Sequence, residues 1–434
     1  MPGTERSALL EWRRYGTVPV AAALGYSLGV IHVYSLGAFM APLQDEFGWT
    51  RAQASVGLTI VGGAAAVAAL PIGLMVDRMG PRRVGLIGAL LMAAAFGLFS
   101  TASGTMANWI LLWSVLAFAS FWVQTTVWTS AVASRFETSR GLAFAVTLSG
   151  GSLGAALFPA LATAFIGQWG WRGAFLGLGA ACGALVVAAL ALFFRGAQDR
   201  KAEPAAPMTG PAPAAALPGL TLREGLRSAT FYRLLLAAGL FAFTTLGVVV
   251  HLVPILRDAG AEPLAAAGTA ALVGLFSIVG RLGVGLLLDR FSGRVVGACA
   301  YLVPIAGAAL LLVDGTDPVS QTIAAALFGL TLGAEVDVIA YLAARHFGLR
   351  NFGGLFGGLV AALSLGTAFG PLAAGLSFDR FGGYSEFLVL TMVLMAISSA
   401  ALASLRPAPV WPEPSSGGTQ VLRPSDVDDA GVEL

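Results

Sequence analysis

Runs of apolar residues long enough to cross a lipid bilayer follow one another along this chain from residue 17 to residue 405. An α-helix needs about 20 predominantly apolar residues to span a hydrocarbon core of about 30 Å. Only 11% of the residues are charged, whereas soluble domains carry about 25%. The sequence therefore predicts an all-α membrane protein. Its twelve transmembrane helices are expected at approximately 17–43, 53–76, 84–102, 108–134, 141–167, 172–195, 231–256, 264–288, 295–313, 319–344, 353–378 and 383–405.

An internal repeat with an offset of 212 residues divides these runs into two groups of six. GLMVDRMGPRRVG, which begins at Gly73, and GLLLDRFSGRVVG, which begins at Gly285, agree at seven of thirteen positions. Parallel repeats of this kind are typical of transporters whose two halves enclose a central site. We predict two pseudo-symmetric six-helix bundles, residues 1–195 and 231–405. A Pro/Ala-rich cytoplasmic linker over residues 196–230 joins them, and a disordered cytoplasmic tail follows over residues 406–434.

Basic residues lie mainly on one side of the predicted membrane domain. With the N-terminus in the cytoplasm, 20 basic residues lie inside, and only Arg51, Arg172, Arg257 and Arg380 lie outside. Positive residues are enriched in cytoplasmic loops, so both termini are expected to be cytoplasmic. Of the 25 basic residues, 24 are arginine. This usage is typical of a bacterium with GC-rich DNA and indicates a multi-pass protein of the bacterial inner membrane.

Arg281 is the basic residue that remains inside a predicted membrane core. Placing arginine at the centre of a membrane costs about 2.5–3.5 kcal/mol, and such residues usually face a cavity. The repeat places Ala69 at the equivalent position, so this charge belongs to the second half alone. A fixed guanidinium can hold a carboxylate through two parallel hydrogen bonds. The residue therefore predicts a binding site for an organic anion.

Two acids in the predicted tenth helix, Glu335 and Asp337, also occur only in the second half. Either could form an ion pair with Arg281 that serves helix packing, or a pair that opens during transport. A desolvated carboxyl group can be protonated, which makes both acids candidates for proton coupling. The two side chains are about 200° apart on a helix and cannot both face one cavity. Tyr341 shares the face of Asp337, which we favour as the cavity face.

Three further polar residues are candidate substrate contacts. His32 and Tyr34 flank one face of the predicted first helix, and Gln124 lies on a face of the fourth helix. Each could instead serve packing alone, because a polar side chain in a membrane finds partners within its own bundle.

The chain resembles the major facilitator superfamily. GLMVDRMGPRR matches the signature of that family between helices 2 and 3, and GLLLDRFSGR repeats it between helices 8 and 9. The resemblance implies a cytoplasmic gate in which the acid faces the positive N-terminal end of a helix from the other half. The implied gate residues are Asp77, Arg78, Arg82, Asp289, Arg290 and Arg294.

A narrower resemblance is to the monocarboxylate and oxalate/formate transporter branch. FMAPLQDEFGWTRAQAS, HLVPILRDAG and GAEVDVIAYLAARHFGLRNFGG carry it, and it implies that Arg281 binds the substrate carboxylate. Leu36 stands near the position of a lysine in the animal carriers, and Ser277 stands where they have an aspartate. Lys201, in the predicted linker, is the sole lysine. The second cation of the oxalate exchanger is thus missing, and a dicarboxylate is disfavoured.

The sequence therefore predicts a secondary active transporter that works by alternating access. Its substrate is expected to be a small organic anion, a monocarboxylate taken up with H⁺. A monomer in the lipid bilayer is the expected functional unit. An exporter of amphipathic drugs or metabolites and a non-transporting membrane sensor are the alternatives. No phosphate-binding GxxxxGK[ST] motif, catalytic cluster or metal-ligand spacing is present, so we expect no enzyme activity, cofactor, metal or nucleic-acid partner.

Overall fold

The structure is a computed structural model. It describes the backbone of residues 2–136, 138–196, 219–348 and 350–409 and, apart from 2–8, 66–74, 77 and 140, their side chains. Most of the predicted linker and of the predicted tail lies outside the described residues. The helices of the first half are α1 (Pro2–Tyr15), α2 (Thr17–Gly29), α3 (Ile31–Phe47), α4 (Arg51–Met79), α5 (Pro81–Leu98), α6 (Met106–Phe121), α7 (Thr125–Ala133) and α8 (Arg140–Phe193). Those of the second half are α9 (Leu222–Arg227), α10 (Ala229–Asp258), α11 (Pro263–Arg290), α12 (Gly293–Asp314), α13 (Pro318–Phe347), α14 (Phe352–Phe381) and α15 (Ser385–Ala403).

The predicted all-α membrane fold is confirmed. Ten helical spans among the described residues are long and apolar enough to cross a membrane. One of them, Gly141–Phe193, contains two crossings, because Gly170 adopts a non-helical backbone (φ 66°, ψ 170°) where the sequence predicts a loop. The 29-residue helix α4 is long enough for the remaining crossing. Twelve crossings result, and three consist of two consecutive helical pieces: α2 with α3, α5 with a 3₁₀ turn, and α6 with α7.

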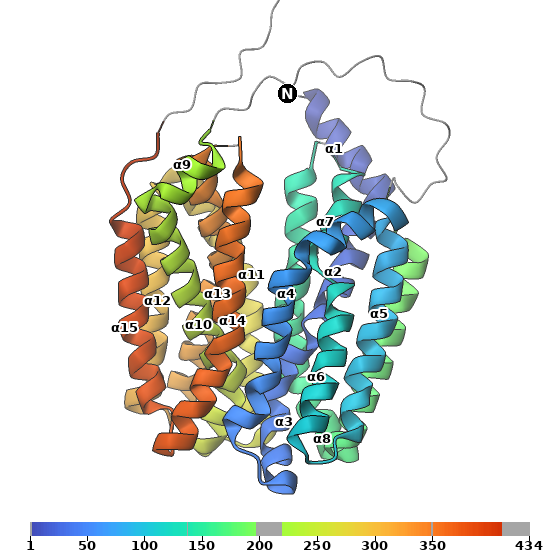
Figure 1. Ribbon diagram of the computed structural model, residues 1–434, viewed down its shortest axis with the longest axis vertical. Helices are drawn as coiled ribbons and strands as arrows, with labels where there is room; N and C mark the ends of the chain where they lie inside the picture. Colours follow the sequence, from blue (N-terminus) through green and yellow to red (C-terminus); the bar gives the residue numbers. More distant parts are fainter. Residues whose placement is uncertain (1, 137, 197–218, 349, 410–434) are drawn as a thin grey trace, which may run out of the picture.

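The crossings form two bundles that stand side by side, with α1–α8 on the right of Figure 1 and α9–α15 on the left. The first bundle has an aromatic core in which the rings of Phe39 and Phe175 stack with centroids 3.8 Å apart. In the second bundle, Phe241 packs against Tyr301 at 4.4 Å. Buried aromatic side chains supply large apolar surfaces with specific ring geometry. Each bundle therefore has its own packed interior.

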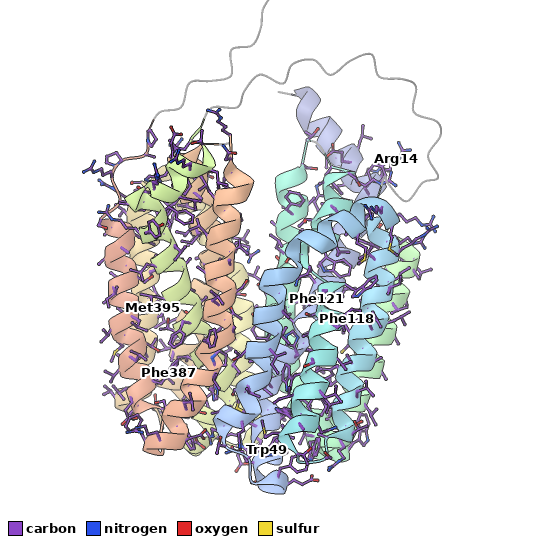
Figure 2. All side chains as sticks on the ribbon, viewed as in Figure 1. Arg14, Trp49, Phe118, Phe121, Phe387 and Met395 are labelled. Carbon is purple, nitrogen blue, oxygen red and sulfur yellow. The ribbon has the colours of Figure 1, made fainter. Side chains whose placement is uncertain are left out.

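The N-terminal segment forms a separate helix, α1, which the apolar pattern does not predict. Trp12 of α1 packs on the ring of Phe136 at 5.3 Å, which anchors the helix at the end of the first bundle. Figure 2 places Arg14 at this end of the molecule and Trp49 at the opposite end. We call the two ends the Arg14 end and the Trp49 end.

Small residues allow the two bundles to approach closely in the middle of the molecule. A Cβ atom at Gly274 of α11 would lie 2.1 Å from the backbone nitrogen of Ala156 in α8. A Cβ atom at Gly62 of α4 would lie 2.6 Å from the Cβ of Ala368 in α14. Glycine at these contacts lets the backbones meet, as small residues do at helix interfaces in membranes. The two bundles therefore touch at these glycines and enclose a cavity beside the contact.

Candidate functional site

A cavity of about 630 Å³ lies between the two bundles. Leu58 and Pro371 line the part of the cavity nearest the Trp49 end of the molecule. Phe144 and Phe356 line the part nearest the Arg14 end. The two phenylalanines are each four residues after the start of their helices, α8 and α14, so the cavity reaches to about 6 Å from those helix ends. Helices of both bundles contribute to the wall. A central cavity shared by two repeats is the usual location of a transport site.

Two helix breaks meet in the wall that the first bundle contributes. The crossing formed by α2 and α3 is interrupted at Val30, and the crossing formed by α6 and α7 is interrupted between Phe121 and Thr125. Gly29 lies against the second break, where a Cβ atom would be 3.3 Å from the carbonyl oxygen of Val123. The indole Nε1 of Trp128 donates a hydrogen bond to the same carbonyl at 3.0 Å. Irregular backbone at membrane depth is tolerated where it lines a cavity or is buried in protein.

The N-terminus of α7 begins in the cavity wall. Gln124, Thr125 and Thr126 all line the cavity, and Gln124 as N-cap makes no side-chain capping hydrogen bond. In this first turn the N–H of Val127 donates to the carbonyl oxygen of Gln124 at 2.9 Å, and the N–H groups before it have no acceptor within the helix. They carry the positive end of the helix dipole, which favours a bound anion. This wall therefore offers main-chain donors to a negatively charged ligand.

Arg281 and Asp337 face each other on the wall that the second bundle contributes. Nε of Arg281 lies 3.6 Å from Oδ2 of Asp337, and the side chains are 19% and 33% exposed. This Nε is buried and has no hydrogen-bond partner within the described part of the chain. Arg281 and Asp337 are the charged members of the described cavity lining. The ion pair is thus loose, and the guanidinium can accept a second anionic partner.

Glu335 lies behind the cavity wall. Its side chain is 6% exposed, is not part of the cavity lining, and has an Oε1 without a hydrogen-bond partner among the described residues. Tyr34 and Tyr301 are within electrostatic range of it. Burying an ionised carboxylate without partners costs far more than burying the neutral acid. The structure thus places Asp337 on the cavity face of α13 and Glu335 on a buried face of the same helix.

The structure places the other predicted substrate contacts in two groups. Gln124 and His32 line the cavity, and the imidazole of His32 also meets Trp113 edge-on at 6.0 Å. Tyr34 packs between the cores of the two bundles and is not among the lining residues. Tyr341 is also outside the lining, because its ring packs where a Cβ of Gly293 would be and lies 5.9 Å from the guanidinium of Arg345.

The predicted gate residues lie at the Arg14 end, where α4, α5, α11 and α12 begin or end. Arg82 donates to the carbonyl oxygen of Ala191, and Arg294 donates to that of Leu405 at 3.2 Å. These equivalent arginines of the repeat each bind the end of the last membrane helix in their own bundle, where a cation is favourable. The side chain of Asp77 lies outside the described residues. The remaining members are exposed in this structure: Arg78, Asp289 and Arg290.

A second charged cluster, which the sequence reasoning missed, joins the bundles at the Trp49 end. Arg51, the first residue of α4, donates to both carboxylate oxygens of Asp258 at 2.6 and 2.8 Å. It also donates to the hydroxyl of Tyr384 at 2.8 Å and lies 3.6 Å from the ring centroid of Phe378. Bidentate pairs of this kind are among the stronger hydrogen bonds in proteins. The pair with Asp258 ties α4 of the first bundle to the end of α10, and the bond to Tyr384 ties it to the residue that precedes α15.

The carboxylate of Asp379, near the end of α14, caps the N-terminus of α4. Its two oxygens accept hydrogen bonds from the backbone N–H groups of Arg51 and Ala52, each at 2.9 Å. An acid at a helix N-terminus is stabilised by the helix dipole. The family resemblance implies such a contact for Asp77 at the Arg14 end. In this structure the same geometry is present at the opposite end.

His251 of α10 extends the cluster toward the cavity. Its Nδ1 lies 2.7 Å from the hydroxyl of Tyr384, and its Nε2 lies 2.9 Å from the carbonyl oxygen of Pro371 and 3.2 Å from Oγ of Ser55. Because a carbonyl only accepts, Nε2 carries the proton and Nδ1 accepts from tyrosine. We refer to Arg51, Ser55, His251, Asp258, Asp379 and Tyr384 as the Arg51 network. One feature of the sequence points to this network. Three of its charged residues stand at the ends of helices, on the side of the membrane where the sequence predicts few basic residues.

Comparisons with known proteins agree with this architecture. The sequence model of the Major Facilitator Superfamily matches residues 22–354. Monocarboxylate transporter 13 of Bos taurus is 28% identical over 390 residues, which cover 87% of this chain and 84% of the relative. An uncharacterised MFS-type transporter, YcxA, of Bacillus subtilis (strain 168) is 23% identical over 377 residues, 83% of this chain and 88% of the relative.

A solved structure shows the same fold. It is the crystal structure of a bacterial homologue of the human lysosomal transporter Spinster in an inward-facing, unoccupied conformation. Its TM-score is 0.68 at 19% sequence identity, and the match covers 89% of this chain and 95% of that one.

Proposed function

Because the chain belongs to the major facilitator superfamily, we propose that it carries a small organic anion, a monocarboxylate, across the membrane together with a proton. The chain is a multi-pass membrane transporter and not an enzyme. The observation that carries the proposal is the loosely paired guanidinium of Arg281 in the wall of the central cavity. Similarity to proteins named monocarboxylate transporters supports the same substrate class.

The substrate carboxylate binds to Arg281, and its remaining polar groups meet the opposite wall. A guanidinium holds a carboxylate through two parallel N–H···O bonds. The first turn of α7, with Thr125 and Thr126, supplies main-chain donors, and Gln124 and His32 supply side-chain contacts. Tyr34 and Tyr341 act as packing residues behind this site.

Protonation of Asp337 couples the proton to the anion. While Asp337 is ionised, it neutralises Arg281, and the cavity lining has no net charge. Once Asp337 is protonated, the lining carries one positive charge, which an incoming carboxylate neutralises. The loaded cavity therefore again has no net charge, which favours movement through a medium of low dielectric constant. Glu335, which is buried behind the cavity wall, stays neutral throughout the cycle.

The Arg51 network holds the Trp49 end closed while the cavity extends to the Arg14 end. The distribution of basic residues supports a cytoplasmic location for the Arg14 end and both termini, and in that orientation the cavity faces inward. The bacterial inner membrane is the proposed location. In the alternate state, the Arg51 network opens and Asp77, Arg78, Arg82, Asp289, Arg290 and Arg294 close the cytoplasmic end.

The volume and apolar character of the cavity favour efflux of amphipathic compounds as a second candidate function. Phe144, Phe356 and Leu363 line a space larger than a three-carbon acid needs. For such compounds Arg281 would be a helix-packing residue. Substrate charge distinguishes the two functions, because the first requires an anion and the second does not.

Uptake into proteoliposomes tests the proposal. The panel contains radiolabelled lactate, pyruvate, acetate, benzoate and oxalate, each supplied with an inward proton gradient. We expect uptake of at least one monocarboxylate above the rate in protein-free liposomes, little uptake of oxalate, and loss of uptake when an ionophore removes the gradient. Absence of uptake across the panel, together with transport of amphipathic cations, would support the efflux function instead.

Changing Asp337 to Asn is expected to separate substrate binding from proton coupling. Asparagine resembles the protonated acid, so Arg281 stays available to the substrate. We expect exchange of labelled for unlabelled substrate to continue, while the stimulation of net uptake by the proton gradient disappears. Exchange and net uptake are measured in the same proteoliposome preparation.

The matched control for this change is Glu386→Gln, which removes an exposed acid from the first turn of α15. It should leave gradient-driven uptake unchanged. If Asp337→Asn keeps the gradient effect and Glu335→Gln loses it, proton coupling belongs to Glu335, and our assignment is wrong.

A further inference from the structure

Two adjoining pockets lie outside the central cavity, where α1, α2 and the end of α8 meet. One, of about 480 Å³, is lined almost entirely by apolar side chains, among them Val20, Leu24 and Leu185. The other, of about 490 Å³, is lined by four arginines: Arg14, Arg82, Arg135 and Arg195. Thr17, Leu192 and Phe193 line both pockets, so the two lie against each other. A basic compartment therefore adjoins an apolar one.

Two arginines of the basic compartment, Arg82 and Arg135, are held in position by hydrogen bonds, and Arg14 and Arg195 are exposed. Arg135 donates from Nε to the carbonyl oxygen of Arg195 at 3.0 Å and from a terminal nitrogen to that of Gly196 at 2.8 Å. Arg82 donates to the carbonyl oxygen of Ala191. The ring of Tyr15 lies 5.4 Å from the guanidinium of Arg14 and 5.1 Å from that of Arg135. No carboxylate is among the described residues that line this compartment.

The apolar compartment faces the surroundings of the protein. The side chains of Val20, Leu185 and Leu192 are 53%, 60% and 66% exposed, so they form an outer surface. Because α2 begins at Thr17 and α8 ends at Phe193, both compartments lie at the level where membrane helices end. Trp12 and Tyr15 of α1 stand at the same level, as aromatic residues do at membrane interfaces. The apolar side chains then face acyl chains, and the arginines face lipid headgroups.

We infer that these compartments form a binding site for an anionic phospholipid. The phosphate of the headgroup binds among Arg14, Arg135 and Arg195, and one acyl chain lies along Val20 and Leu185. Basic pockets between membrane helices are suited to such headgroups. A free phosphate ion fills only the basic compartment, whereas the lipid fills both. This site is separate from the transport cavity, and it ties α1 to the end of α8.

Lipid retention by the full-length protein tests the inference. The delipidated protein is supplied with equal amounts of a phosphatidylglycerol and a phosphatidylcholine of the same acyl chains, and native mass spectrometry counts the retained molecules. We expect preferential retention of phosphatidylglycerol. The variant Arg14→Gln/Arg195→Gln should weaken it by about fivefold for each arginine. The control Arg223→Gln/Arg227→Gln removes two exposed arginines of α9 and should have no effect.

Competition on the wild-type protein gives a result that does not depend on the variants. Glycerol 3-phosphate and a short-chain phosphatidylglycerol are added to the complex with the long-chain lipid. We expect the short-chain lipid to displace the long-chain lipid only at high excess. Glycerol 3-phosphate should not displace it. Displacement by glycerol 3-phosphate as effective as that by the short-chain lipid would show a free-anion site. Equal retention of the two phospholipids, or equal losses in the arginine variant and its control, would also overturn the inference.

Discussion

Arg281→Gln is expected to lower the efficiency of monocarboxylate uptake by about 100-fold. The substitution removes the fixed charge of the cavity wall and two charge-assisted hydrogen bonds, each contributing about 1.5 kcal/mol. Arg281→Lys keeps the charge but not the planar fork, so we expect an intermediate loss of about tenfold. Initial rates of gradient-driven uptake over a range of substrate concentrations measure both effects.

Arg350→Gln provides the matched control, because Arg350 is an exposed arginine between α13 and α14, away from the cavity lining. It should transport at the wild-type rate. Thermal unfolding distinguishes loss of function from loss of structure. We expect Arg281→Gln to remain folded, because Asp337 is 33% exposed and water can solvate its carboxylate when the arginine is absent. Wild-type uptake by a folded Arg281→Gln protein would show that the arginine serves helix packing, and the proposed substrate class would lose its main support.

Arg51→Gln is expected to shift the protein toward a state that is open at the Trp49 end. It breaks the bidentate pair with Asp258 and the hydrogen bond to Tyr384. Breaking a fully buried pair costs 3–5 kcal/mol. Because Asp258 is 40% exposed, we expect about 2 kcal/mol here, or about a 30-fold change in the ratio of the two states.

Double electron–electron resonance measures this shift. Spin labels at positions 45 and 262, which are exposed and belong to different bundles at the Trp49 end, report the separation of the bundles in a background without Cys182 and Cys299. Asp379→Asn should act in the same direction but less strongly, by about fivefold, because it weakens one charge–dipole contact. Arg380→Gln, a change at the exposed neighbour of Asp379, is the control. Unchanged label distances in Arg51→Gln would show that packing alone closes this end.

The membrane crossings could be predicted because each depends on local composition, and Gly170 breaks α8 where the apolar pattern predicts a loop. The depth of Arg281 also follows from its distance along a helix. The spacing between Asp337 and Tyr341 favours the cavity face for Asp337, yet Tyr341 itself is covered by the start of α12 at Gly293. Helical spacing gives the direction of a side chain but not the neighbouring helix that covers it.

The Arg51 network could not be predicted in the same way, because it depends on contacts between distant parts of the chain. Arg51 and Asp258 are separated by 207 residues, and Arg51 and Tyr384 by 333. No periodicity or motif records that their helix ends meet. The break in the crossing formed by α6 and α7 also could not be predicted from the sequence, because it too depends on contacts with other helices. Its sequence, FWVQT, has neither proline nor glycine, and packing against Gly29 and the bond from Trp128 stabilise it.

Because the crossings of the first bundle are broken, mutation can change the polarity of the two cavity walls to different extents. The donors at the start of α7 belong to the peptide backbone, so exchanging the side chains of Thr125 or Thr126 leaves them in place. On the facing wall, polarity comes from the side chains of Arg281 and Asp337, which single substitutions can remove or invert. Diversification of ligand charge among descendants of such a protein would therefore proceed through α11 and α13, while the first bundle retains a constant set of donors.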